Sequence, residues 1–307
     1  MTGRCDHPAL FYRGWADYLA GTVPFIRDGL AADQRVAVAV PGPNLAVLRS
    51  ALGGDAGRVH MLDMNEVGRN PGRIIPGVLR AFADEGTDTG RVRIVGEPIW
   101  PGRTDVEYPA CVQHEALINR AFEGRDVTIL CPYHAAELAP EVLADAEATH
   151  PVLVDREGVR VSDAFAPEEM VDRYNRPLPP PPGDCATLRF DVDGLAAVRR
   201  FVSGHAVAAG LSEWRAGDLA MAVNELATNS VVHGGGAGTV RTWAETGHVV
   251  CETADPGWIT DPLVGRQPVP PDGVGGRGLL LVNELADLVR MHSAATGTTV
   301  RVYVRRG

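Results

Sequence analysis

The chain has 307 residues, enough for two domains of ordinary size, and its 45% hydrophobic and 22% charged residues are typical of a globular protein. The formal net charge of −10 and the scattered basic residues argue against direct binding to nucleic acid. All 29 basic residues are arginine, so a Walker-type phosphate lysine and a Schiff-base lysine are both excluded.

The cysteines and the apolar segments indicate the compartment of the protein. Its five cysteines form no CxxC pair, and an odd number without a signal peptide is typical of reduced thiols. No segment reaches the roughly 18 uninterrupted apolar residues of a membrane span. We therefore expect a cytoplasmic protein without a membrane segment.

Metal-ligating residue types are present, but their local spacing does not form a metal motif. His114 and Glu115 fall in a predicted helix and have no second His or Cys at metal-binding spacing. We therefore expect no metal there and no structural zinc. Cys111 and Cys131 are expected to pack as small hydrophobic side chains.

The first half of the chain alternates short apolar runs with helical patterns. Helical spacing over residues 7–30 predicts an opening helix or helix pair. Strands are then predicted at residues 35–40, 59–64, 91–95 and 127–131, and the helices that follow them at 45–52, 76–84, 108–122 and 135–147. Buried strands that alternate with helices indicate a doubly wound parallel sheet, which we place at residues 1–160.

Polar, aromatic and arginine residues follow the predicted strands of this sheet. Ligands of such sheets gather at the carboxyl ends of the strands, so these segments predict a small-molecule pocket. Its candidate residues are Asn65, Arg69, Glu97, Trp100, Arg103 and Tyr133. The alternative is that they are ordinary turn residues and surface arginines. No GxxxxGK[ST] motif follows the first strand, so phosphate binding of the P-loop kind is excluded.

A proline-rich stretch separates this domain from the second one. Residues 175–184 contain five prolines, which favour extended polyproline II, so we predict a semi-rigid linker at residues 161–184. An SH3-type ligand is the less favoured interpretation. In residues 185–307, strands are predicted at 186–190, 239–245, 248–254 and 298–304, and helices at 192–209, 215–233 and 276–288. This order predicts an α+β sandwich with helices on one face of a mixed sheet.

One helix of the second domain carries a carboxylate and an amide on the same face. Glu225 and Asn229 are four residues apart, so they stack along one side of the helix. A carboxylate can orient or accept a proton, and an amide oxygen can be a hard ligand for Mg²⁺. With the Gly-Gly-Gly stretch that follows, the pair predicts a magnesium–nucleotide site.

This helix and three later motifs follow the order of motifs in the GHKL, or Bergerat-fold, ATPases. The later motifs are Asp255 with Gly257 at a strand end, residues 273–278 before a helix, and Thr298 with Thr299. Over residues 186–307 the chain resembles the branch of anti-sigma-factor serine kinases, the RsbW-like proteins. The resemblance implies a Bergerat-fold sandwich that binds ATP and Mg²⁺.

The resemblance also implies a role for each matching residue. Glu225 matches the general base or water-polarising carboxylate, and Asn229 matches the Mg²⁺ ligand. Asp255 matches the aspartate that accepts a hydrogen bond from the adenine amino group, and Gly257 allows close backbone approach. The other implied nucleotide-binding residues are Gly276, Arg277 and Gly278 in the second glycine box, where backbone amides at a helix start can meet phosphate, and Thr298 or Thr299 beside the adenine pocket.

One residue differs from the family pattern, and a second segment of the chain imitates part of that pattern. Ile259 stands where the DxGxG motif has its second glycine, so the loop over the nucleotide is expected to close differently. Asn283-Glu284-Leu285 repeats three letters of the Glu225 helix, but Leu288 replaces the amide four residues after the glutamate. We interpret this repeat as a plain helix face.

The first domain resembles the MEDS domain, a ligand-sensing module related to RecA-like ATPases but without their phosphate loop. The resemblance covers residues 7–155. It rests on His7 with Tyr12, residues 68–71 and 73–76, Gly-Glu-Pro-Ile-Trp at 96–100, His114–Leu117 and Cys131–Tyr133. It implies a RecA-like sensory domain for a small organic molecule and does not identify that molecule.

Together the two resemblances imply a regulator with a sensor and a kinase-like domain. The second domain would bind Mg-ATP, phosphorylate a serine or threonine of an anti-anti-sigma partner of the STAS type, and sequester a sigma factor. By analogy it would form a homodimer. The alternative is a non-catalytic switch that docks an anti-anti-sigma or sigma protein without phosphorylating it. A sensor histidine kinase is disfavoured, because no helical hairpin with a phosphoacceptor His lies between the domains.

Overall fold

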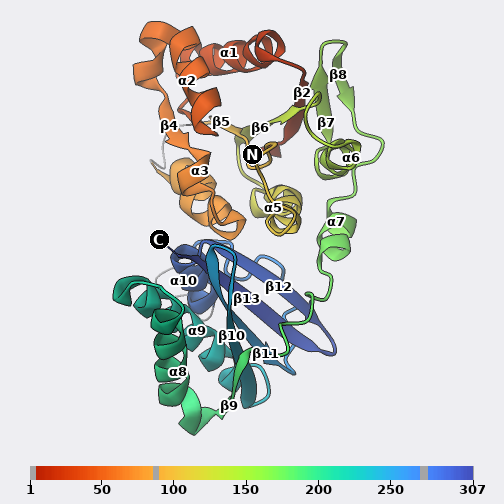
Figure 1. The fold of residues 1–307 in the computed structure, drawn as a ribbon. Helices are drawn as coiled ribbons and strands as arrows, with labels where there is room; N and C mark the ends of the chain where they lie inside the picture. The colour runs from red at the N-terminus through yellow and green to blue at the C-terminus, as the bar shows by residue number, and fades with distance from the viewer. Residues whose placement is uncertain (1–4, 86–89, 270–275, 307) are drawn as a thin grey trace. The chain divides into compact units, whose positions relative to one another are not determined.

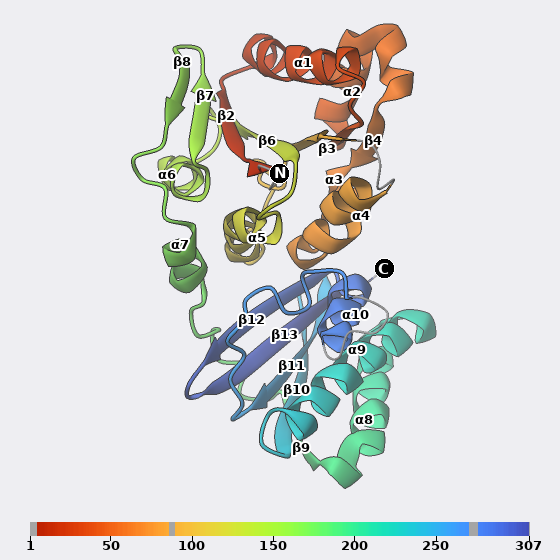
Figure 2. The same cartoon turned by 180° about the vertical axis from the view of Figure 1, so that it is seen from behind.

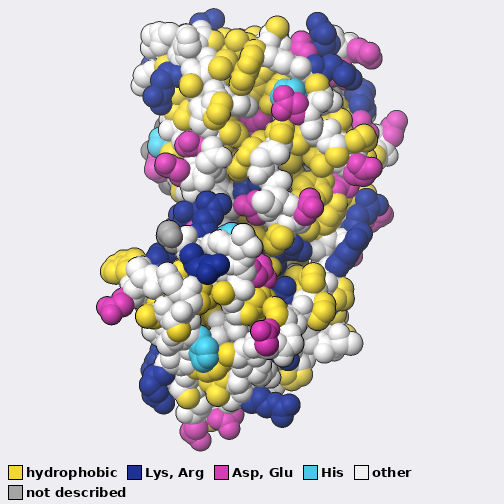
Figure 3. Space-filling view, viewed as in Figure 1, with side chains coloured by type: hydrophobic (Ala, Val, Ile, Leu, Met, Phe, Trp, Pro, Cys, Tyr) yellow, Lys and Arg dark blue, Asp and Glu magenta, His cyan; other side chains and the backbone are white. Residues whose placement is uncertain are grey.

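The computed structural model describes residues 5–85, 90–269 and 276–306 and divides the chain into two compact units, residues 1–174 and 175–307 (Figure 1). None of the described helices is both long and apolar enough to cross a membrane. On the face drawn in Figure 3, arginine side chains lie among aspartates and glutamates on both units. This mixing agrees with the expectation of scattered rather than clustered basic residues.

Within the described residues, the first unit contains an eight-stranded sheet with the order β4-β3-β5-β6-β2-β7-β8, and β1 pairs with β6. The strands are β1 Cys5–Asp6, β2 Pro8–Tyr12, β3 Val36–Val40, β4 His60–Asp63, β5 Val92–Gly96, β6 Val127–His134, β7 Val152–Asp155 and β8 Gly158–Val161. Every pair is parallel except β7 with β8. All five residues of β3 are buried, as expected of a strand covered on both faces.

Helices cover both faces of this sheet. They are α1 Trp15–Ala31, α2 Gly42–Leu52, α3 Met64–Val67, α4 Ala81–Asp84, α5 Tyr108–Ala121, α6 Pro140–Thr149 and α7 Pro167–Tyr174, with the 3₁₀ helices η1 Gly53–Arg58 and η2 Pro71–Arg73 and the π-helix η3 Ile75–Arg80. Figures 1 and 2 show α1 and α2 on one face and α5 on the other. The expected doubly wound parallel sheet is confirmed.

The predicted opening helix is wrong over its first residues. Pro8–Tyr12 form β2, which lies between β6 and β7, and the helix begins only at Trp15. The strand reads Pro-Ala-Leu-Phe-Tyr, and periodicity cannot distinguish so short an apolar run from one turn of a buried helix. A central strand was therefore assigned to the helix that follows it.

Two further differences lie at the end of the first unit. The helix predicted at 135–147 begins at Pro140, because β6 continues to His134. The range 161–184, expected as a linker, contains α7, which packs against α5 within the first unit and accepts a hydrogen bond at the carbonyl of Val171 from Gln113 Nε2 (3.4 Å). The extended proline-rich segment thus begins at Asn175.

The second unit is an antiparallel sheet with helices on one face. The strands are β9 Ala186–Asp191, β10 Ala237–Glu245, β11 His248–Asp255, β12 Leu288–Ala294 and β13 Gly297–Arg305, in the order β12-β13-β11-β10-β9. The helices are η4 Val192–Gly194, α8 Leu195–Ala208, α9 Glu213–Val232 and α10 Arg277–Leu285. The expected sandwich is confirmed, although all of its strand pairs are antiparallel rather than mixed.

Helix α9 forms the centre of the second core. Its N-cap is Ser212, whose side chain accepts a hydrogen bond from the Arg215 amide. Leu219, Val223 and Leu226 recur at helical spacing and are buried in one cluster with side chains of β10, β11 and β13. Each such buried side chain contributes roughly 1.5–3 kcal/mol of transfer free energy. This packing fixes the rotation of α9 and therefore the direction of Glu225 and Asn229.

Strand β12 was not predicted from the sequence. The helix predicted to reach Leu288 ends at Leu285, and only Ala286 and Asp287 separate it from the strand. No glycine or proline marks the boundary, so the usual stop signal is missing. Asp287 instead donates its amide to the Tyr303 carbonyl (3.0 Å), which directs the chain onto β13.

Candidate nucleotide site

The predicted carboxylate and amide lie on α9 beside the start of α10. A Cβ atom placed on Gly278 would lie 2.9 Å from Glu225 Oε2 and 3.4 Å from Asn229 Nδ2. A glycine at this position therefore lets the first turn of α10 approach the pair. The N-cap of α10 is Gly276 in the left-handed conformation (φ 78°), which L residues rarely adopt. The first turn of α10 carries backbone N–H groups without intrahelical partners, which suit phosphate oxygens.

A cavity of 480 Å³ lies next to these residues. Seven of the nine residues proposed from the sequence line it: Asn229, Asp255, Gly257, Gly276, Arg277, Gly278 and Thr298. Glu225 reaches the same place through its approach to Gly278. The other two glycines of the motif, Gly273 and Gly275, lie outside the described residues. The volume falls within the roughly 300–1,000 Å³ of small-molecule sites.

Asp255 at the end of β11 is held by a hydrogen bond at each carboxylate oxygen. Ser230 Oγ donates to Oδ2 (2.7 Å), and the Gly257 amide donates to Oδ1 (2.8 Å). Ser230 lies on α9 next to Asn229, so the same helix supplies the amide and orients this carboxylate. Each oxygen keeps a further lone pair, so the carboxylate can accept a hydrogen bond from an amino group in the cavity.

A chain of hydroxyl groups supports the loop after β11. The Ile259 amide donates to Ser293 Oγ (2.8 Å), Ser293 Oγ lies 2.7 Å from Thr298 Oγ1, and Thr298 Oγ1 donates to the Gly257 carbonyl (2.8 Å). Since Thr298 uses its proton on Gly257, Ser293 must be the donor between the two hydroxyls. Hydrogen bonds that follow one another in such a chain polarise and strengthen one another. The chain fixes the backbone of Gly257 at the cavity wall.

Of the two threonines, the structure places Thr298 in the cavity. Thr298 is buried, whereas Thr299 is half-buried and pairs with His292 on β12 and with Ala254 on β11. Successive residues of a strand face opposite sides of the sheet, so only one of the two can face the helices.

Ile259, at the position of the second motif glycine, contributes an apolar wall. It lines the cavity and packs, partly buried, against the core together with Val264 and Met291. Asn283 holds the same loop to α10, because its Nδ2 donates to the carbonyls of Gly265 (2.9 Å) and Leu279 (3.2 Å). Asn283 is therefore a buried tether and not part of a plain helix face.

Ser230, Ser293 and Asn283 were not identified as site residues from the sequence. Ser230 was recognisable only as a small residue near Asn229. Ser293 lies on the unpredicted strand β12, so its approach to Thr298 had no sequence signal. Asn283 carried a signal, the repeated Asn-Glu-Leu, but that repeat was interpreted as a plain helix face.

The six sensory candidates of the first unit fall into separate hydrogen-bonded groups. The Arg103 guanidinium donates to the carbonyls of Gly68 (2.6 Å) and Pro98 (2.9 Å) and stacks 4.0 Å from the Trp100 ring, and its Nη1 donates to the carbonyl of Arg69. Asn65 is exposed and hydrogen-bonded to Asp63 Oδ1. Arg103 thus acts here as a structural clamp, and a ligand pocket formed by these residues stays a prediction.

Glu97 and Tyr133 are the buried members of the six. Glu97 accepts hydrogen bonds from Tyr12 OH (2.9 Å), Asn44 Nδ2 (2.7 Å) and Tyr18 OH (3.4 Å). Burial raises the pKa of Glu97 to about 8, although these three donors act to lower it. Among the described residues, Tyr133 OH has no hydrogen-bond partner, and its ring lies 5.5 Å from that of His150.

Comparison with known families agrees with both parts of this structure. Residues 6–151 match the family model of MEDS, described as the MEthanogen/methylotroph, DcmR Sensory domain. Residues 188–304 match the model of the histidine kinase-like ATPase domain. The chain thus joins a MEDS domain to a histidine kinase-like ATPase domain, the combination that its motifs indicated.

One similar solved structure is that of the RsbU and RsbW domains of Rv1364c from Mycobacterium tuberculosis. Sequence identity to it is 21% and the TM-score is 0.30, and the match covers 39% of this chain and 32% of that chain. The match therefore spans about a third of the length of that protein chain. No curated protein matches the sequence.

Proposed function

We propose that the second domain binds Mg-ATP, phosphorylates a serine or threonine of a STAS-type anti-anti-sigma partner, and sequesters a sigma factor under control of the sensory domain. The observation that carries this proposal is the cavity, which is lined by Asp255 and Thr298 as well as by Asn229 and the first turn of α10. The family of the second domain supports nucleotide binding in general.

The residues present fit the chemistry of a magnesium nucleotide. Asp255, oriented by Ser230, accepts the hydrogen bond of an adenine amino group. Asn229 offers an amide oxygen, a ligand type that Mg²⁺ accepts, and the bound ion offsets negative charge on the phosphates. The amides at the start of α10 add a second, metal-independent set of donors to phosphate oxygens.

Glu225 is the proposed base. It stands one helical turn before Asn229 and reaches Gly278 at the start of α10, so it lies beside the proposed phosphate position. From there it can accept the proton of a partner's hydroxyl as the phosphoryl group is transferred. The partner must therefore present its hydroxyl at this end of the cavity.

The experiment compares two glutamates that share the tripeptide Asn-Glu-Leu. Phosphate transfer from labelled ATP to a STAS protein is measured for the full chain, for Glu225→Ala and for the exposed control Glu284→Ala. We expect transfer to fall by roughly 10²–10⁴-fold in E225A only, the usual effect of losing a general base. Binding to the partner should persist in both variants. Undiminished transfer in E225A would remove Glu225 from the role of base.

Ile259 is the observation that favours the second candidate function, a non-catalytic switch. Its side chain occupies a wall where the family motif has a glycine, so the loop over the nucleotide is built differently. In that case the domain docks the anti-anti-sigma or sigma protein through the same fold without transferring phosphate. Isothermal titration of the full chain with ATP and ADP separates the two functions, since no heat of binding with either nucleotide would favour the switch.

A further inference from the structure

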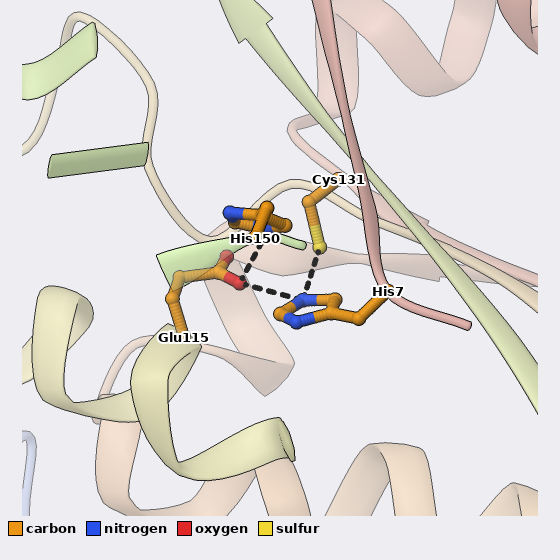
Figure 4. A group of neighbouring side chains, drawn as sticks. All are labelled: His7, Glu115, Cys131 and His150. Carbon is orange, nitrogen blue, oxygen red and sulfur yellow. Dashed lines mark hydrogen bonds and ion pairs between the residues drawn. The ribbon is translucent and has the colours of Figure 1, made fainter. Parts of the chain in front are cut away.

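Four buried side chains with metal-ligating atoms converge in the first domain (Figure 4). His7 lies between β1 and β2, Glu115 on α5, Cys131 on β6, and His150 at the end of α6. Each is at most 1% exposed, and their ligand atoms all lie within 4.8 Å of one another. They are called the His7 cluster below.

Three distances between ligand atoms of the His7 cluster are short and nearly equal. Glu115 Oε2 lies 3.2 Å from His7 Nε2 and 3.3 Å from His150 Nε2, and Cys131 Sγ lies 3.4 Å from His7 Nε2. A tetrahedral zinc ion with bonds of roughly 2.0–2.3 Å separates neighbouring ligand atoms by roughly 3.3–3.7 Å. Three of the six spacings are therefore close to the edges of such a tetrahedron, and the other three are at most 4.8 Å.

The tautomer of His7 follows from its other neighbour. Asn119 Nδ2 donates to the carbonyls of Ala116 (3.1 Å) and Thr149 (2.9 Å), so the amide oxygen of Asn119 is the atom that faces His7 Nδ1 at 3.3 Å. An amide oxygen only accepts, so Nδ1 carries the proton of the ring. His7 Nε2 then directs a lone pair into the cluster.

His150 is oriented in the same way. Its Nδ1 lies 2.8 Å from the carbonyl oxygen of Ala146, which can only accept, so Nδ1 is again the protonated nitrogen. Its Nε2 therefore also directs a lone pair at Glu115. Partners of this kind, which hold the outer ring nitrogen and direct the inner one, are the usual surroundings of metal-binding histidines.

In the His7 cluster, the inner ring nitrogens of both histidines face the Glu115 carboxyl group. Among the described residues, Glu115 Oε1 and His150 Nε2 have no hydrogen-bond partner. Such buried, unpaired acceptors are costly.

We propose that the His7 cluster binds one divalent transition-metal ion, and that Zn²⁺ is the ion that it fits. Two imidazoles, a carboxylate and a thiol are all zinc ligands, and a tetrahedral site needs four. Because all four positions come from buried protein side chains, the site is closed, as in structural rather than catalytic zinc centres. Binding releases the thiol proton of Cys131 and leaves a thiolate on the metal.

The test is a metal analysis of the full chain with two matched cysteine variants. Cys131→Ser removes a ligand, and Cys111→Ser changes another fully buried cysteine of the same domain. Wild type and C111S should each hold about one zinc ion per chain after zinc loading and gel filtration. C131S should bind zinc more weakly by at least the roughly 10–100-fold that the loss of an outer partner costs.

Cobalt substitution adds a signature that a merely packed cysteine cannot produce. The Co²⁺ form of the wild type and of C111S should show a thiolate-to-cobalt charge-transfer band, and C131S should lack it. If C131S does not fold, the melting temperature of the wild type still tests the proposal. A chelator should lower that temperature, and added zinc should restore it. A wild type that takes up less than about a tenth of an equivalent of zinc would overturn the proposal. Equal zinc content in C131S and C111S would also overturn it, since surface histidines would then hold the metal.

Discussion

At the scale of single residues, the site depends on groups that orient the predicted ones. Asp255 was recognisable from its motif, but its direction is set by Ser230 on one oxygen and by the Gly257 amide on the other. A motif identifies the residue that contacts a ligand. The residue that orients it can be any small hydrogen-bond donor that the fold brings near. For this reason seven proposed residues were found in the cavity while Ser230 and Ser293 were missed.

This arrangement makes Ser230→Ala a sensitive variant. It removes the donor to Asp255 Oδ2, and a hydrogen bond to a charged group contributes about 1.5–3 kcal/mol. We expect the Kd for ADP, measured by isothermal titration, to rise roughly tenfold. Thr228→Ala is the control, because that hydroxyl donates to the Asn224 carbonyl on the same helix. A Kd unchanged by S230A would mean that Asp255 needs no such orientation.

Glu97 predicts a pH dependence of the stability of the first domain. Its pKa is raised to about 8 in the folded state, so between about pH 5 and 8 the folded chain keeps a proton that the unfolded chain has lost. Stability therefore falls as pH rises through this window, by about 1.4 kcal/mol for each unit of pKa difference.

Urea unfolding of the wild type and of Glu97→Gln at several pH values measures this effect. The variant keeps an uncharged polar group in place, so the fall in stability should be much smaller in it. His7, whose pKa is lowered to about 4, gives an opposite slope below about pH 6.5, but this contribution is the same in both proteins. Parallel curves for the two proteins would show that Glu97 does not titrate in this range.

At the scale of elements, regular segments were predictable and boundaries without signals were not. The strand β3 and the helices α5 and α9 were found close to their observed bounds, because their patterns are long or strongly periodic. β2 was assigned to the helix that follows it, since it is a short apolar run, and β12 was not predicted, since it follows a helix without a breaker. Both segments are strands because they pair with β6 and β13, and the local sequence carries no signal of that pairing.

The tether between α10 and the loop after β11 is testable at this scale. Asn283→Ala leaves the Gly265 carbonyl without its donor and should cost about 1–3 kcal/mol of the stability of the second domain. Hydrogen exchange of residues 259–269 should accelerate, while exchange in β10 stays as it was. Asn224→Ala is the control, because the side-chain amide of Asn224 accepts a hydrogen bond from Arg199 at the surface. Unchanged exchange in the loop would show that other contacts hold it.

At the scale of the whole chain, the order of two domains was predictable, but the attachment of the segment between them was not. The proline-rich stretch was expected as a spacer, yet its first residues are bonded to the second unit: Asn175 to Ser293 on β12, and the Pro179 carbonyl to Arg301 on β13. Composition predicts the extended conformation, whereas the docking depends on single side chains. The four ligand atoms of the His7 cluster were unpredictable for a similar reason, because residues 7, 115, 131 and 150 meet only in the fold.

Asn175→Ala should release the start of this segment. The variant loses two hydrogen bonds to Ser293, so the segment should open more often and chymotrypsin should cleave after Tyr174 roughly tenfold faster. Asp184→Ala, an exposed change at the other end of the segment, should leave the rate unaltered. Equal cleavage of N175A and wild type would show that other contacts hold the segment, such as those of His292 with the carbonyl of residue 175 and of Arg301 with the Pro179 carbonyl.

The pairing of Asn175 with Ser293 has a consequence for self-association. β12 is the edge of its sheet, and the Asn175 side chain, a primary amide, accepts from the Ser293 amide (3.0 Å) and donates to the Ser293 carbonyl (2.8 Å). It thus imitates the peptide group of one further strand. Open strand edges are templates for aggregation, and here a single side chain blocks the template at that point.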